Sequence, residues 1–193
     1  MRIDDTHMEM ASPVAIVLPR RPRLYQYPLA VVLALAGGVL GIIGAAFHES
    51  FAFSPLPFLI AAPIIEEIAK PAGVYLAMAR WPQTVRNPLF IACLAALGGI
   101  VFGLIESLIY VTVYAPDLGR SFFIYRFAVN VPLHGGFSFI AGLGITQGLF
   151  AWAGGRGPFP KRSRNAFAAA MILHALYNLV AVILSVGGVL EFE

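Results

Sequence analysis

Long apolar stretches separated by short polar segments make up most of this sequence. The stretches cover residues 28–47, 56–78, 88–114, 121–152 and 165–190. Each is long enough to cross a bilayer as an α-helix, which needs about 20 residues. We therefore expect an all-α protein, a polytopic transmembrane helical bundle of about five spans.

Polar segments set the boundaries of this bundle. Residues 1–27 are polar and mixed in charge, residues 28–190 hold all of the apolar stretches, and residues 191–193 form a short end. We expect an N-terminal tail, a single transmembrane domain and a short C-terminus. The stretch 121–152 is too long for one simple span. Pro132 predicts a bend within it, with room for an extra half-span before the proline.

The distribution of charge predicts the orientation. Only 12% of the residues are charged, against about 25% in soluble domains. The net charge of +3 comes from basic residues beside apolar stretches and indicates no nucleic-acid partner. With five spans, ten of the 13 Lys and Arg residues lie on one side, and only Arg120 and Arg126 lie on the other. Basic loops stay in the cytoplasm, so we expect a multi-pass cell-membrane protein with its N-terminus in the cytoplasm and its C-terminus outside.

Three charged residues, Glu66, Glu67 and Lys70, lie inside the second apolar stretch. Each opposes insertion by about 3 kcal/mol, so such charges are expected to face a cavity, a partner helix or a reaction. Glu66 and Lys70 share one helix face, and Pro71 predicts a kink beside them. One lysine cannot neutralise two carboxylates, which favours a functional site over a structural ion pair.

Polar residues in three other stretches fall at a similar depth. Glu106 follows Phe102 on one helix face, and His174 and Asn178 lie one turn apart. Counted at 1.5 Å per residue, they lie roughly 12–24 Å below the outer surface. His134 belongs to this level if its helix begins near residue 121. We expect these side chains to meet in one layer, together with those of Glu66 and Glu67.

Two kinds of chemistry fit such a set. Adjacent carboxylates in a poorly solvated site cannot easily both be ionised, so they supply an acid and a base. His174 and Asn178, on one helix face, can hold an oxyanion as it develops. Alternatively, Glu106, His134 and His174 match a zinc site with an open position. The competing functions are a proton- or metal-coupled transporter or channel, which uses the same residue types, and a non-catalytic membrane partner.

Four short motifs follow one another on successive apolar stretches. They are Glu66-Glu67-x-x-Lys70, Phe102-x-x-x-Glu106, His134 and His174-x-x-x-Asn178. In this order they resemble the PrsW-type intramembrane protease family, which is similar to the larger group of CAAX prenyl endopeptidases and bacteriocin-processing membrane proteins. The resemblance implies cleavage of a membrane-anchored protein in the bilayer, such as a single-span anti-sigma factor. The family is classed as metalloproteases, whereas its relatives support a metal-free glutamate mechanism.

The resemblance also implies roles for the carboxylates. Glu66 and Glu67 match the paired glutamates, and in the prenyl endopeptidases the first of the pair helps to activate water. Glu106 stands where those relatives carry a histidine that shares this task. Lys70 replaces their arginine at a shorter spacing. Both departures favour the PrsW type over processing of prenylated proteins.

The remaining motif residues are two histidines and an asparagine. His174 and Asn178 match the His-x-x-x-Asn pair of the relatives, which supports an oxyanion or a metal. His134 matches the additional histidine of the PrsW-type pattern. The resemblance thus assigns all three residues to the same site as the glutamates.

Overall fold

The computed structural model describes residues 21–49 and 55–187, with side chains described for residues 21–46 and 59–187. Within these ranges the regular structure is entirely helical, with no strand. The predicted all-α fold is therefore confirmed. Most of the expected tail, residues 1–27, and the expected end, residues 191–193, lie outside the described residues.

The helices follow the apolar stretches closely. In chain order they are α1 (Gln26–Glu49), α2 (Pro55–Ala69), α3 (Ala72–Arg80), α4 (Pro88–Ile109), η1 (Tyr110–Tyr114), α5 (Arg120–Tyr125), η2 (Arg126–Asn130), α6 (Val131–Gly142), α7 (Gln147–Ala153) and α8 (Lys161–Val186). The two elements labelled η are π-helical turns that continue α4 and α5.

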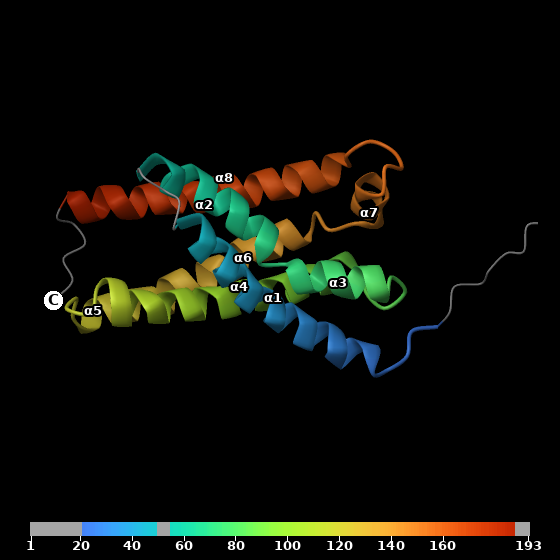
Figure 1. The fold of residues 1–193 in the computed structure, drawn as a ribbon, viewed down its shortest axis with the longest axis horizontal. Coiled ribbons are helices and arrows are strands. Elements are labelled where there is room, and N and C mark those ends of the chain that lie inside the picture. Colours follow the sequence, from blue (N-terminus) through green and yellow to red (C-terminus); the bar gives the residue numbers. More distant parts are fainter. Residues whose placement is uncertain (1–20, 50–54, 188–193) are drawn as a thin grey trace, which may run out of the picture.

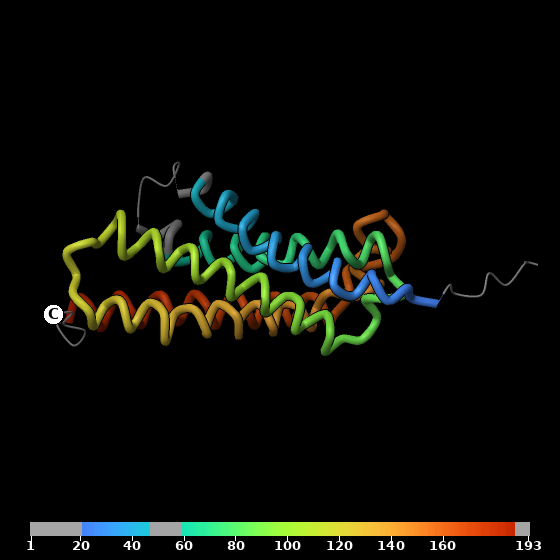
Figure 2. The backbone as a smooth tube through the Cα atoms, turned by 90° about the horizontal axis from the view of Figure 1, so that it is seen from below, coloured from blue at the N-terminus to red at the C-terminus, as the bar shows by residue number. Residues whose placement is uncertain are grey.

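The chain passes back and forth along the long axis of one bundle. Helices α1, α4 and α8 run in one direction, and α2–α3 and α5–α6 run in the other (Figures 1 and 2). This alternation is what the expected topology requires. In the described part of the chain, three helices are individually long and apolar enough to cross a membrane, and a fourth span results if α5–α6 and the bent α7 are taken together. With 15 and 9 residues, α2 and α3 would cross only as a pair.

The break between α2 and α3 falls at the charged segment. Helix α2 ends at Ala69, and Pro71 precedes the first residue of α3. Proline has no N–H to donate to the carbonyl of Glu67, and its ring crowds that carbonyl, so the helix cannot continue unchanged. The predicted kink is therefore present, and it places Lys70 at the junction of two helices.

Glycines allow the helices to cross in close contact around this junction. A Cβ added at Gly73 on α3 would overlap the carbonyl oxygen of Leu33 on α1. One added at Gly99 on α4 would overlap the carbonyl oxygen of His134 on α6. Small residues permit such approaches between membrane helices. The close approach of α4 and α6 brings His134 against the helix that carries Glu106.

The fourth apolar stretch differs from the expectation. Residues Arg120–Gly142 form one continuous helix that contains Pro132, so this described segment has no separate half-span before the proline. The π-helical turn η2 directly precedes Pro132 and loosens the backbone where the proline ring would crowd the previous turn. The bend comes instead after Gly142, where α7 departs by 74°.

Candidate active site and metal centre

Lys70 lies at the centre of a buried polar cluster. Its Nζ is 2.7 Å from Oε1 of Glu67 and 3.0 Å from Oε2 of Glu66. It is also 2.8 Å from Nδ1 of His134 and 4.3 Å from the centre of the Phe102 ring. An ammonium group only donates hydrogen bonds, so Nδ1 of His134 is the acceptor. Such an imidazole is neutral and carries its proton on Nε2.

The paired glutamates differ in their surroundings. Glu67 is fully buried, and its Oε1 accepts a 3.0 Å hydrogen bond from Nδ1 of His174 in addition to that from Lys70. Its Oε2 accepts one of 3.3 Å from Ser138. Glu66 instead lines a pocket of about 520 Å³. The Lys70 ammonium lies beside Oε2 of Glu66 as an ion pair, but no hydrogen bond from the described residues reaches this buried oxygen.

Glu106 enters the same pocket from α4. Its Oε2 accepts from Nη2 of Arg126 at 2.7 Å and from Nδ2 of Asn130 at 3.0 Å. The same oxygen lies 3.0 Å from Nε2 of His134. The guanidinium carbon of Arg126 is 4.0 Å from the centre of the Tyr110 ring. The Glu106 side chain is 20% exposed, more than that of either paired glutamate.

Glu66, His134 and His174 form a group that can hold a metal ion. One potential ligand atom from each lies within 4.8 Å of the other two, and all three residues are buried. Nδ1 of His134 is 4.0 Å from Oε2 of Glu66, and Nε2 of His174 is 3.9 Å from the same oxygen. The other nitrogen of His174 is bonded to Glu67. A carboxylate in this position is the usual partner that orients a metal-binding histidine.

A divalent metal fits the donor types of this group. Two imidazoles and a carboxylate are common zinc ligands, and Oε2 of Glu66 accepts no hydrogen bond from the described residues, although the Lys70 ammonium lies 3.0 Å away. His134 is the constrained member, because Lys70 contacts its Nδ1 and Glu106 its Nε2. A metal ion and Lys70 would therefore compete for the same atoms. The carboxylate among these three potential metal ligands is therefore Glu66, whereas the sequence suggested Glu106.

Asn178 lines the pocket one turn beyond His174 and is partly buried. The neighbouring Tyr177 donates a 3.2 Å hydrogen bond to Oδ1 of Asn130, and its hydroxyl is 2.7 Å from that of Tyr125. Apolar side chains from α2 and α8 also line the pocket: Leu59, Ala62, Ala181, Val182 and Val186. The pocket thus combines polar residues with an apolar wall.

The structure brings the sequence-selected residues together. Contacts connect Glu66, Glu67, Glu106, His134 and His174, and Asn178 lines the pocket beside them. These residues come from α2, α4, α6 and α8, which are distant from one another in the sequence. The layer expected from their depths is therefore a real cluster of side chains.

Sequence reasoning missed Arg126, Asn130 and Tyr177. The sequence places Arg126 at the outer surface, but in the structure it is only 8% exposed and pairs with Glu106. The missed signal is the spacing of Arg126, Asn130 and His134, which recur every four residues on one continuous helix. Pro132 hides this spacing in the sequence, because a proline between Asn130 and His134 suggests that the helix is interrupted there.

A comparison with protein families gives a match over nearly the whole chain. The family model described as PrsW family intramembrane metalloprotease matches residues 25–192. This range contains all of the helices and every residue of the pocket. Searches of curated proteins and of solved structures give no match.

Proposed function

The chain belongs to the PrsW family of intramembrane metalloproteases, and on this premise we propose that the pocket between α2, α4, α6 and α8 is its active site. The reaction is hydrolysis of a peptide bond in a membrane-anchored protein. One observation carries the proposal: Glu66, His134 and His174 offer ligand atoms within 4.8 Å of one another. Two of these residues, Glu66 and His134, also line the pocket that a substrate would enter.

Zinc is the metal that this ligand group suits best, with Glu66, His134 and His174 as the residues that would hold it. In sites of this kind zinc acts as a Lewis acid that polarises a carbonyl group and makes water more acidic. Glu67 keeps His174 in a fixed orientation through the 3.0 Å contact with Nδ1. Glu106 does the same for His134 through the 3.0 Å contact with Nε2. Glu67 and Glu106 therefore each orient a histidine that would bind the metal.

Glu106 is the residue that we assign to proton transfer. The resemblance to the prenyl endopeptidases gives this task first to Glu66, but with Glu66 among the ligands it passes to Glu106. Among the described residues, the contacts of Glu106 with Arg126, Asn130 and His134 all use Oε2, and none of these three contacts engages Oε1. As the water oxygen bonds to the substrate carbonyl carbon, Glu106 takes the water proton. It returns that proton to the amine nitrogen when the C–N bond breaks.

Asn178 is assigned to the carbonyl oxygen of the scissile bond. Its amide lies in the lining of the pocket, one helical turn from His174. An N–H donor aimed at that oxygen stabilises the negative charge that develops during attack. Because the amide is neutral, it offers this hydrogen bond without forming an ion pair with Glu66 or Glu106.

The substrate proposed is a single-span membrane protein, and an anti-sigma factor is the type that the family resemblance implies. The apolar side chains of α2 and α8 in the pocket wall suit a segment that leaves the bilayer. The peptide groups of a membrane helix are internally hydrogen-bonded. The segment that is cut must therefore unwind locally before its carbonyl can be attacked.

We further infer that the active-site pocket faces the outside of the cell membrane. Basic residues gather where α3 ends and α8 begins (Figure 1): Arg80, Arg86, Arg156, Lys161, Arg162 and Arg164. The pocket lies toward the opposite end, with Tyr110 and Tyr125 beside the α4–α5 turn. Since Arg126 is buried, only Arg120 of the two outer basic residues stays near the surface. Basic loops remain cytoplasmic, which gives a cytoplasmic N-terminus and an outside C-terminus.

A cleavage assay tests this function. Candidate single-span proteins are co-expressed with the wild type, Glu66→Gln, Glu106→Gln or Asp117→Asn, and the product is followed by size on a gel. Asp117 is exposed in the α4–α5 turn and controls for loss of a carboxylate. Loss of acid–base catalysis costs about 10²–10⁴-fold. We therefore expect Glu106→Gln to lose at least about 100-fold in cleavage rate. Glu66→Gln should also lose cleavage, because it removes a proposed metal ligand, and Asp117→Asn should cut normally.

The amount of folded protein is measured in the same cells. Glutamine keeps the shape of glutamate and relieves repulsion within the carboxylate pair, so Glu66→Gln should fold in normal amounts. A folded Glu66→Gln protein that cuts at the wild-type rate would remove Glu66 from the site. A variant that fails to fold would favour the structural ion-pair interpretation instead.

A further inference from the structure

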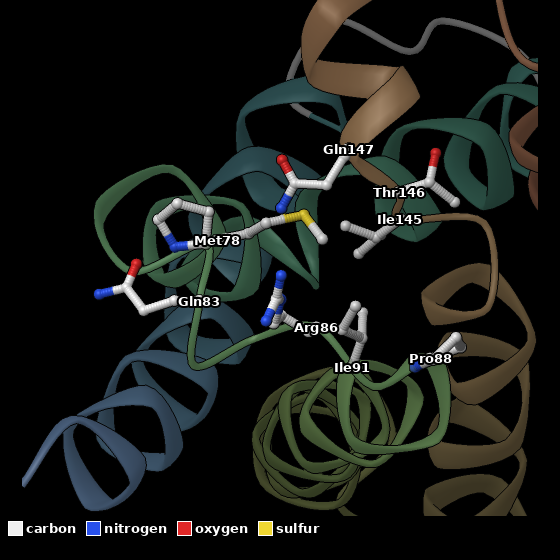
Figure 3. A pocket seen from close by; sticks show the side chains of 9 residues that line it. Met78, Gln83, Arg86, Pro88, Ile91, Ile145, Thr146 and Gln147 are labelled. Carbon is white, nitrogen blue, oxygen red and sulfur yellow. The ribbon is translucent and has the colours of Figure 1, made fainter. Parts of the chain in front are cut away.

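A second pocket lies at the basic end of the bundle. It has a volume of about 500 Å³ and is formed by the α3–α4 loop, the start of α4 and the α6–α7 turn (Figure 3). Its apolar base consists of Met78, Ile91 and Ile145, each only 2% exposed. Pockets of about 300–1,000 Å³ are the usual size for small-molecule sites. This pocket shares no residue with the proposed active site.

Three polar side chains at this pocket have no partner among the residues that the structure describes. Within residues 21–49 and 55–187, no hydrogen bond or ion pair joins the side chains of Gln83, Arg86 or Gln147 to another residue. The Arg86 guanidinium and the Gln147 amide project into the pocket (Figure 3). Thr146 is different, because its hydroxyl accepts a 3.2 Å hydrogen bond from the backbone of Leu149. The Gln83 amide points away from these two groups (Figure 3). The pocket therefore holds one cationic donor and one neutral donor for a ligand.

Both walls of the pocket are anchored to the bundle. Thr84, two residues before Arg86, donates a 2.6 Å hydrogen bond to the buried side chain of Gln26 on α1. On the other wall, Ser163 of α8 donates a 2.6 Å hydrogen bond to the carbonyl oxygen of Gly144. The backbone segments that carry Arg86 and Gln147 are thus held in place by the rest of the bundle, which lowers the entropic cost of binding a ligand.

The surroundings indicate an anion that belongs to a lipid. Arg80 and Trp81 end α3 beside the pocket, and a basic residue next to an aromatic one is typical of the membrane interface. Pro88 lines the pocket, and the adjacent Leu89 is 62% exposed, so an apolar surface continues away from the polar donors. Basic pockets between membrane helices on the cytoplasmic side bind lipid phosphates.

We propose that this pocket binds the phosphate of an anionic phospholipid headgroup, with Arg86 as the charged donor and Gln147 as the neutral donor. The buried apolar base lies under the glycerol region, and the acyl chains leave along the surface at Leu89. The site plays no part in the proposed hydrolysis, so its test stands apart from the test of the protease.

The test measures lipids retained by the purified full-length protein in detergent, by native mass spectrometry. The probes are phosphatidylglycerol and phosphatidylcholine, whose headgroups differ in net charge. A charge-assisted hydrogen bond to phosphate is a strong one, so Arg86→Gln should reduce retained phosphatidylglycerol about tenfold. Arg156→Gln removes the same charge from an exposed residue at the same end, outside the pocket, and should retain it normally. Phosphatidylcholine should bind weakly to all forms.

A variant that keeps the net charge distinguishes specific binding in the pocket from a general attraction between anionic lipid and basic residues. Gln147→Leu should lower retention roughly two- to tenfold, the worth of one neutral hydrogen bond. An unchanged Arg86→Gln protein, or an equal loss in Arg86→Gln and Arg156→Gln, would overturn the proposal. Inorganic phosphate is the second probe. If it protects the wild type from heat as well as phosphatidylglycerol does, and Arg86→Gln abolishes this protection, the ligand is a soluble phosphate and the lipid assignment is overturned.

Discussion

Lys70 balances the charge of the proposed active site. Its ammonium contacts Glu66, Glu67 and His134, and the residue has no exposed surface. Removal of one member from a buried ion network costs about 3–5 kcal/mol, because an uncompensated charge stays behind. The Lys70 contacts with Glu66 and His134 use the same atoms that we assign to the metal. A bound metal and the ammonium would therefore compensate the same negative charge.

Replacement of Lys70 by methionine should lower the yield of folded protein, because two buried carboxylates lose their nearest cation. Zinc in the growth medium should restore part of this yield, since a bound divalent ion supplies positive charge at Glu66. Fluorescence-detected size exclusion measures the yield with and without zinc. The control is Lys161→Met, a change at an exposed lysine that opens α8, and its yield should match the wild type.

Two results would count against this role of Lys70. An undiminished yield of Lys70→Met would show that other groups balance the carboxylates. A reduced yield that zinc leaves unchanged would show that lysine and metal do not serve the same charges. Comparison with Lys161→Met removes any general effect of losing a lysine.

The sequence predicts pairs of site residues better than it predicts their roles. The four-residue spacing of Glu66 with Lys70, and of His174 with Asn178, places each pair on one helix face. Adjacent Glu66 and Glu67 necessarily point in different directions on a helix. Which of them faces the pocket depends on the rotation of α2 against its neighbours, and helix packing sets that rotation rather than local spacing.

At the level of helices, proline predicts the helix break correctly at Pro71 but not at Pro132. Pro71 interrupts the helix as predicted: α2 ends at Ala69, and a new helix, α3, begins at Ala72. Pro132 does not, because the π-helical turn η2 takes up the strain and the helix continues. Single-sequence patterns do not reveal such a turn. The sequence alone therefore does not show that Arg126 lies on the same helix face as Asn130 and His134.

The crossing of α1 and α3 depends on the absence of a side chain at Gly73. Gly73→Ala would place a Cβ on the carbonyl oxygen of Leu33, so the helices must separate. We expect a loss of about 1–3 kcal/mol, the usual cost of overpacking, or more. Gly136→Ala on α6 is the control, since its added Cβ meets nothing within 4 Å. It should be neutral or slightly stabilising, because alanine favours helix.

Thermal unfolding of the two glycine variants in one detergent provides the comparison. The account requires a clear drop in the unfolding midpoint for Gly73→Ala and little change for Gly136→Ala. Equal midpoints would mean that the α1–α3 contact has no special steric demand. The result also bears on the site, because the same crossing supports the segment that carries Lys70.

For the whole molecule, the two ends of the bundle have different properties. The proposed active-site pocket lies toward the α4–α5 turn, and the basic residues and the second pocket lie at the end where α3 stops (Figures 1 and 3). This polarity follows from the alternating direction of the helices. A chain with cytoplasmic basic loops would present its proteolytic pocket to substrates at the outer half of the membrane.

Cysteine labelling tests this orientation in intact cells. Cys93, the single cysteine, is exposed on α4 and is first replaced by serine. A membrane-impermeant maleimide added outside should then label Glu193→Cys. It should label Arg156→Cys only after the membrane is permeabilised, because that loop is expected to be cytoplasmic. The reverse pattern would invert the orientation, and labelling of both from outside would contradict the number of spans.

We propose that Glu66, His134 and His174 hold a metal in the active site while Glu106 transfers protons. The metal content of the purified protein tests it most directly, with elemental analysis of the wild type, Glu66→Gln, His174→Ala and Glu106→Gln. We expect about one zinc per chain in the wild type and in Glu106→Gln, as for a single site with three protein ligands. Much less zinc is expected in Glu66→Gln and His174→Ala. A proteolytically active wild type without metal, or full zinc content in both ligand variants, would contradict it.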